Sequence, residues 1–242
     1  MLQTDLSRGG HNSEEAVRYY QGEANYYIAY NFHLMGQSGK AREYIEAAKR
    51  YLPRAEHINY LSGLLHYQSG ELQSARGDFM KVMQAGATNC DAQYHLGRIY
   101  RELKEEPDEQ TPEQTTGIKV PESLAEYLKQ VPPDREPKDK RSLNYFLAAC
   151  SCMESSSRNM EGQIRSVPTM DLSDTDKLLL QDRLRNKLNN YRQSSSSLID
   201  GMMRLTATSE SDKKDDYFNL MKEMRDRIVN AAIPAGTASN SQ

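Results

Sequence analysis

Tyrosine is the residue type whose number and spacing in this sequence could do chemistry. The chain of 242 residues contains 15 tyrosines, 4 phenylalanines and no tryptophan, and Tyr26, Tyr60 and Tyr94 stand 34 residues apart. A tyrosine side chain combines a large, rigid apolar ring with a hydroxyl group, so several tyrosines on one surface suit the binding of a protein segment. The pattern therefore indicates molecular recognition.

Residues typical of catalytic sites do not form a recognisable motif. The sequence lacks a glycine-rich phosphate loop and a His-Glu-x-x-His motif. Its five histidines are His11, His33, His57, His66 and His95. His33, His57 and His66 could form an acid–base arrangement with Glu23 or Asp91. Such an arrangement would lack a nucleophile and a cofactor-binding motif. We therefore expect no enzyme activity, no catalytic residues and no cofactor.

The cysteines do not predict a metal site either. Cys150 and Cys152 are two residues apart, which on a helix separates them by about 200° around the axis. No second cysteine or histidine pair has a matching metal-ligand spacing. We expect no bound metal.

The elements that must position the tyrosines follow from the same spacing. A unit of 34 residues is the length of two antiparallel helices joined by a tight turn. In the second unit, apolar residues recur at helical intervals on both sides of Ser69-Gly70. Gly63 and Gly97 fall inside helices, where glycine costs about 1 kcal/mol relative to alanine. We therefore expect a neighbouring helix backbone to pack closely against them.

Residues 22–101 resemble the tetratricopeptide repeat family. The residues that carry the resemblance are Ile28-Ala29, Phe32, Gly36, Ala41, Ile45, Ala48 and Pro53 in the first unit, Ser62-Gly63, Tyr67, Gly70, Leu72, Ala75, Phe79 and Val82 in the second, and Leu96-Gly97-Arg98-Ile99-Tyr100 in the third. The second unit has Ala87 where the family usually has a terminal proline. The resemblance implies an all-α solenoid of three to four helical hairpins, the third interrupted, with a C-terminal helical extension.

In that family, a concave wall formed mainly by the first helix of each hairpin holds extended or helical peptides. The repeat register places on this wall Tyr26, Tyr30, His33, His57, Tyr60, Tyr67, Tyr94, Arg98, Arg101 and Tyr145. Arginine adds forked donors for carboxylates, so we expect a partner peptide of acidic and apolar character. The alternative is that these tyrosines fill gaps between helices and expose only their hydroxyl groups.

One specialised ligand is not expected. Family members that bind the C-terminal tails of heat-shock chaperones clamp the terminal carboxylate with asparagines and basic residues. The corresponding positions here hold Tyr26, Tyr30, Leu61, Asp91 and His95.

Composition shifts divide the chain into six expected segments. They are a flexible leader (1–12), regular repeats (13–104), an acidic, proline-containing insert with a short helix from Pro121 and a linker (105–140), a degenerate fourth repeat (141–172), a helical cap (173–231) and a disordered tail (232–242).

Within the expected cap, a long helix begins near Ser173 and the serine run 194–197 predicts a turn. Tyr217, Met221, Met224 and Ile228 form the apolar stripe of a last helix. Such a stripe covers the end of a repeat array or, alternatively, contacts a partner or a second copy. The basic helix 177–192 could contact nucleic acid, but interleaved aspartates favour a solvated face.

The net charge and the amino-terminal residues limit the expected partners and location of the protein. The formal net charge is −3, which gives no general attraction to nucleic acid. The first residues lack an apolar run, so no signal peptide or transmembrane segment is expected. We expect a cytoplasmic adaptor or scaffold, as one subunit of a larger complex. The alternatives left open are a self-assembling homo-oligomer and an exported protein whose signal has been removed.

Overall fold

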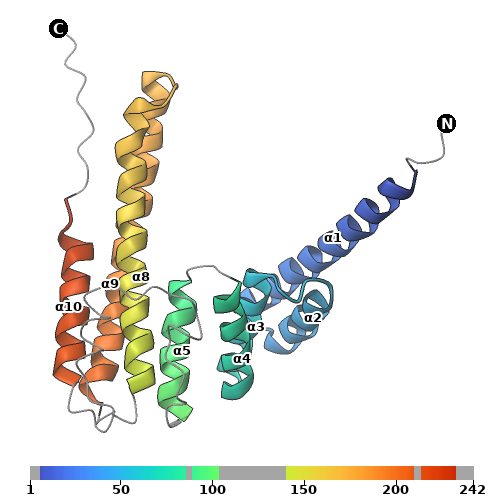
Figure 1. Cartoon of the computed structure of the whole chain (residues 1–242), viewed down its shortest axis with the longest axis horizontal. Coiled ribbons are helices and arrows are strands. Elements are labelled where there is room, and N and C mark those ends of the chain that lie inside the picture. The colour runs from blue at the N-terminus through green and yellow to red at the C-terminus, as the bar shows by residue number, and fades with distance from the viewer. Residues whose placement is uncertain (1–5, 86–88, 104–139, 210–213, 233–242) are drawn as a thin grey trace. The chain divides into compact units, whose positions relative to one another are not determined.

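The computed structural model describes residues 6–85, 89–103, 140–209 and 214–232, excluding the side chains of residues 6–12, 140 and 141. Every regular element in these ranges is helical. The described residues fall into two compact units, one ending at Leu103 and one beginning at Lys140 (Figure 1). Within these ranges, no helix is long and apolar enough to cross a membrane.

The described residues of the first unit form five helices. They are α1 (Leu6–Leu34), α2 (Ser38–Tyr51), α3 (Glu56–Gln68), α4 (Leu72–Gln84) and α5 (Cys90–Leu103). The helices pack as neighbours in chain order, with α1 against α2 and α3 against α4 (Figure 1). The predicted helix–turn–helix units are thus confirmed for the first two copies of the 34-residue period.

The turns of both hairpins depend on glycine. Gly36 and Gly70 have φ angles of 71° and 74°, a left-handed conformation that is accessible to glycine at little cost. At each turn, the residue after glycine donates a backbone hydrogen bond back into the helix, Gln37 to Phe32 and Glu71 to His66, both at 2.9 Å. This is the hydrogen-bond pattern that ends a helix with a C-terminal glycine. The two glycines therefore end α1 and α3 in the same way.

Small residues let the helices approach one another. Ala29, Ala41 and Ala75 are fully buried. A Cβ added at Gly63 would lie 3.0 Å from two ring carbons of Phe79. The close neighbour of Gly63 is thus an aromatic side chain of α4, where we expected a helix backbone.

Helix α1 begins earlier than predicted. It includes residues 6–12, which were predicted to belong to a flexible leader. Gly9 and Gly10 lower the local helix propensity, but no proline blocks the helix from continuing toward the amino terminus. The backbone is therefore already helical before Ser13, and the predicted helix start at Ser13 is wrong.

The second unit contains α8 (Lys140–Ser166), the 3₁₀ helix η2 (Val167–Thr169), α9 (Asp174–Ala207) and α10 (Lys214–Asn230). Each of the three α-helices packs against the other two. The predicted stripe of Tyr217, Met221, Met224 and Ile228 is buried, and the Tyr217 hydroxyl donates to Asn144 Oδ1 at 2.8 Å. The last helix thus uses its apolar face inside this unit.

Two sequence expectations for this unit are wrong. Residues 140–166 form one continuous helix, not the helix pair expected for a degenerate fourth repeat in 141–172. The serine run 194–197 lies inside α9 and does not form a turn. Serine favours turns only weakly and is tolerated in helices, and Ser195 is 3% exposed. Packing of α9 against its neighbours therefore prevails over local turn preference.

The start of α9 agrees with prediction. Ser173 is the N-cap residue, and its hydroxyl accepts a hydrogen bond from the Asp176 backbone N–H at 3.1 Å. Residues 105–139 of the expected insert, short helix and linker (105–140) and residues 233–242 of the expected tail (232–242) lie outside the described residues.

Candidate binding site

The first group of predicted site residues lies where α1 meets α3. The rings of Tyr26 and His57 pack edge to face with centroids 4.5 Å apart, and Tyr30 stacks on Tyr26 at 6.1 Å. His57 Nε2 lies 2.9 Å from Glu23 Oε1. Burial raises the pKa of Tyr26 above its ordinary value, and so do its tyrosine neighbours and Glu23. The Tyr26 hydroxyl therefore stays protonated and can donate a hydrogen bond.

The second group surrounds His95 on α5. The His95 ring lies parallel to Phe79 with centroids 5.1 Å apart and meets three tyrosines edge to face. Its centroid distances are 5.3 Å to Tyr94, 5.5 Å to Tyr67 and 6.4 Å to Tyr60. Burial, followed by the positive charge of Arg98, lowers the pKa of His95 to about 4. His95 is therefore a neutral aromatic ring at physiological pH.

Polar contacts at the edge of this second group connect α3 with α5. The Tyr67 hydroxyl donates to Glu102, while the Arg98 guanidinium lies over the Tyr67 and Tyr94 rings at 5.1 and 5.8 Å from their centroids. Burial raises the pKa values of Tyr60 and Tyr67 well above the ordinary tyrosine value. These contacts hold the rings in fixed orientations and leave the Arg98 side chain 37% exposed.

We name these residues the tyrosine–histidine face. Its members are Tyr26, Tyr30, His57, Tyr60, Tyr67, Tyr94, His95 and Arg98 on α1, α3 and α5. Seven of the ten predicted site residues belong to it. Tyr26, His57, Tyr60, Tyr67 and Tyr94 are half-buried and Tyr30 is exposed, so their rings pack on one another and also reach the surface.

The other three predicted site residues are placed differently. His33 and Arg101 are half-buried on α1 and α5, and no ring contact joins His33 to the face. Tyr145 belongs to the second unit and is only 2% exposed. A buried tyrosine offers no surface to a partner, so Tyr145 is not a member of the face.

His95 is a member of the face that was not predicted from the sequence. Leu61 precedes it by one 34-residue period and is 3% exposed, so the register alone would have placed His95 in an interior position. The signal that could have identified His95 is the presence of a histidine at a repeat position that is apolar in the preceding unit.

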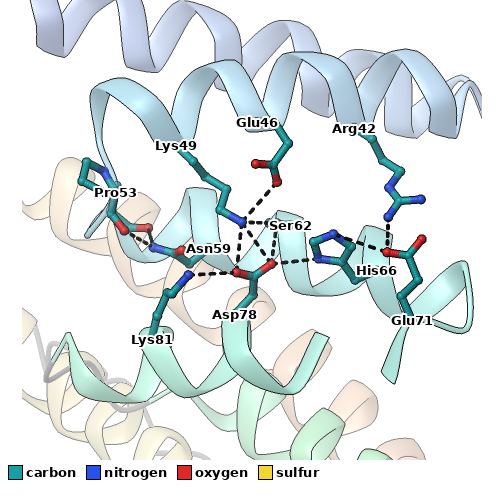
Figure 2. A network of polar contacts seen from close by, with 11 residues as sticks. Arg42, Glu46, Lys49, Pro53, Asn59, Ser62, His66, Glu71, Asp78 and Lys81 are labelled. Carbon is teal, nitrogen blue, oxygen red and sulfur yellow. Dashed lines mark hydrogen bonds and ion pairs between the residues drawn. The ribbon is translucent and has the colours of Figure 1, made fainter. Parts of the chain in front are cut away.

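A second constellation, also in the first unit, centres on the buried carboxylate of Asp78 (Figure 2). Asp78 accepts hydrogen bonds from Ser62 Oγ at 2.5 Å, His66 Nδ1 at 2.9 Å and Lys49 Nζ at 3.0 Å. Burial alone would raise the pKa of Asp78, but these hydrogen bonds outweigh burial and hold the pKa below its ordinary value. Asp78 is therefore a charged group inside the unit.

This constellation contains serine, histidine and aspartate, but its hydrogen bonds do not connect them in the sequence that nucleophilic catalysis requires. A serine nucleophile needs a histidine that accepts its proton. Here Ser62 donates directly to Asp78 and is fully buried. The three side chains tie α3 to α4, and Lys49 adds α2 (Figure 2), so their geometry is that of a structural clamp.

Among the described residues, no three histidine, cysteine, aspartate or glutamate side chains gather as a metal site. Comparison of the sequence with protein-family models and with curated proteins gives no match. The chemistry of the tyrosine–histidine face is therefore the basis for assigning a function.

Proposed function

We propose that this chain is a non-catalytic adaptor whose first unit binds a segment of a partner protein at the tyrosine–histidine face. The observation that carries the proposal is that α1, α3 and α5 each contribute partly exposed aromatic rings, which contact rings of the neighbouring helix. Rings held by their neighbours lose little conformational freedom on binding, which favours affinity.

The polar groups of the face indicate the character of the partner segment. Arg98 lies over two tyrosine rings, and its Nη2 forms an ion pair with Glu102 Oε1 at 3.8 Å. Guanidinium groups bind carboxylates in a forked geometry. The face therefore suits a segment that has apolar side chains for the rings and an acidic side chain for Arg98.

The repeat architecture supports the same proposal. Tetratricopeptide-type hairpins place their first helices side by side, and here contacts between side chains join α1 to α3 and α3 to α5. The matching turns at Gly36 and Gly70 agree with that resemblance. The tetratricopeptide assignment itself is part of the proposal, because it rests on sequence pattern and fold analogy.

A selection experiment tests the proposal. Peptides that bind the purified chain are selected from a random library displayed on phage, and their affinities are then measured for a Tyr60→Ala/Tyr94→Ala variant. We expect the selected peptides to be rich in apolar and acidic residues and to lose about tenfold or more in affinity, equivalent to about 1.4 kcal/mol.

A control variant separates binding from folding. Arg50→Ala/Tyr51→Ala changes two residues of α2, outside the face, and should leave peptide affinity unchanged. Circular dichroism must show that both variants keep their helix content. Failure to select any peptide, or equal binding by the Tyr60/Tyr94 variant in its folded state, would contradict the proposal.

A second candidate function is self-association through α1. This helix exposes several large apolar side chains, including Val17 at 54%, Tyr20 at 70% and Leu34 at 64%. Exposed apolar groups gathered on one helix are typical of contact surfaces. Light scattering over a concentration series decides between a monomer of 27.6 kDa and an oligomer. An oligomer that dissociates on Val17→Ser/Tyr20→Ser substitution would favour self-assembly.

A further inference from the structure

The second unit contains a pocket of about 690 Å³ between α8 and the carboxyl end of α10. Two glutamates of α8, Glu154 and Glu161, line this pocket and are each only 7% exposed. Three arginines, Arg158 and Arg165 of α8 and Arg227 of α10, line it as well. This site is separate from the tyrosine–histidine face and does not depend on the function proposed for that face.

All four carboxylate oxygens of the two glutamates already have guanidinium partners. Arg227 binds Glu154 in a forked arrangement, with Nε 2.8 Å from Oε1 and Nη2 3.2 Å from Oε2, and Arg158 also donates to Oε1. Glu161 receives Arg192 at 2.7 Å on Oε1 and Arg165 at 3.1 Å on Oε2. The glutamates therefore hold the arginines in place.

The arginines have donor capacity left for a ligand. Their side chains are 67% (Arg158), 65% (Arg165) and 48% (Arg227) exposed, whereas those of Glu154 and Glu161 are 10% and 9% exposed. A guanidinium has five N–H donors, and the contacts of Arg158 with Glu154 and of Arg165 with Glu161 use one donor each. The pocket thus presents arginine N–H donors and their positive charge to solvent, whereas its two glutamates are already hydrogen-bonded. A ligand must therefore supply acceptor oxygens.

The spacing of the arginines narrows the ligand class. Arg158 and Arg165 are seven residues apart on α8, which corresponds to about 10 Å along a helix axis. A peptide in the extended polyproline II conformation has three residues per turn and rises about 3.1 Å per residue, so carboxylates three residues apart lie on one side about 9 Å apart and match this separation. Glu154, Glu161 and Asp226 line the same pocket and would oppose the dense negative charge of a nucleic acid. We propose that this pocket binds an extended acidic segment of a partner protein, with one carboxylate at Arg158 and a second at Arg165.

A peptide titration tests the proposal on the full chain. The probe is a fluorescein-labelled peptide, Gly-Glu-Ala-Ala-Glu-Gly, with its terminal groups blocked, and binding is followed by fluorescence anisotropy. We expect saturable binding that weakens as salt is added. Affinity should fall about tenfold or more in the Arg158→Gln/Arg165→Gln variant, which removes two exposed charges and is expected to fold.

The matched control is Arg183→Gln/Arg204→Gln, which removes the same charge from two exposed positions of α9. This variant should bind the peptide as the wild type does. The same peptide with glutamines in place of glutamates should not bind. Absence of saturable binding, equal loss of binding in both arginine variants, or equal binding of the glutamine peptide would overturn the proposal. Tighter binding of a single-stranded oligonucleotide than of the peptide, lost in the Arg158/Arg165 variant alone, would assign the pocket to phosphates and overturn it as well.

Discussion

Nζ of Lys49 lies 3.0 Å from Oδ1 of Asp78, although the two residues are 29 positions apart in the chain. Lys49 belongs to α2 and Asp78 to α4, so this ion pair joins two successive hairpins. The Lys49 and Asp78 side chains are 17% and 4% exposed. A pair of this kind costs desolvation when it forms, and removal of one partner leaves the other charge buried and unpaired.

We therefore predict that Asp78→Asn lowers the free energy of unfolding by about 3 kcal/mol. Urea denaturation followed by circular dichroism measures this change. Glu43→Gln removes a carboxylate from an exposed position of α2 and should change the free energy of unfolding by less than about 0.5 kcal/mol. Equal stability of the two variants would show that the buried ion pair does not hold the hairpins together.

Alanine substitutions at two helical glycines of the first unit should change the free energy of unfolding in opposite directions. Gly63→Ala places a Cβ 3.0 Å from the Phe79 ring, and we expect a net loss of about 1–2 kcal/mol because strain exceeds the gain in helix propensity. Gly77→Ala in α4 meets no atom within 4 Å and should gain about 0.5–1 kcal/mol. Thermal unfolding of both variants distinguishes these effects. Stabilisation by Gly63→Ala would mean that Phe79 shifts at little cost.

Burial of His95 predicts a pH dependence of stability. Its pKa is lowered to about 4 from about 6.5 in the unfolded chain, so the unfolded state binds the proton more tightly. The stability contributed by neutral His95 is fully present above about pH 6.5 and is lost as pH falls toward about 4. The full loss corresponds to about 3 kcal/mol.

A comparison of wild type with His95→Phe measures this contribution. Phenylalanine keeps a ring parallel to Phe79 but cannot take up a proton. The free energy of unfolding, measured by urea denaturation at about pH 7 and about pH 5, should drop less in the variant than in the wild type. An identical drop in both proteins would place the pH dependence on other groups.

Two serines of the second unit should respond to alanine in opposite ways. Ser173 caps the amino end of α9 with its hydroxyl, so Ser173→Ala should cost about 1 kcal/mol. Ser194 is exposed inside the same helix, and Ser194→Ala should gain a few tenths of a kcal/mol, about 0.5 at most. Chemical denaturation of the two variants checks both signs. Destabilisation by Ser194→Ala would indicate that its hydroxyl makes a structural contact.

The sequence by itself determined those features that depend on local and periodic signals. The 34-residue period predicted the two hairpins, because each apolar face recurs at helical spacing and Gly36 and Gly70 supply the left-handed turns. The Ser173 cap and the apolar stripe beginning at Tyr217 are local signals of the same kind. Seven of the predicted site residues fall into the two groups of side-chain contacts on α1, α3 and α5, because the repeat register brings equivalent helix positions close together.

Only the tertiary structure decided which polar groups became buried and which helices continued through ambiguous sequence. His95 lies among four aromatic rings from α3, α4 and α5, and Lys49 meets Asp78 across two hairpins. The sequence Glu154-x-x-x-Arg158 followed by Glu161-x-x-x-Arg165 reads as ordinary pairing along one helix. Its role changes when α10 brings Arg227 and α9 brings Arg192 to the same carboxylates. The physical reason is that burial and electrostatic pairing depend on neighbours distant in the chain, whereas helix turns and periodicity depend on residues close by.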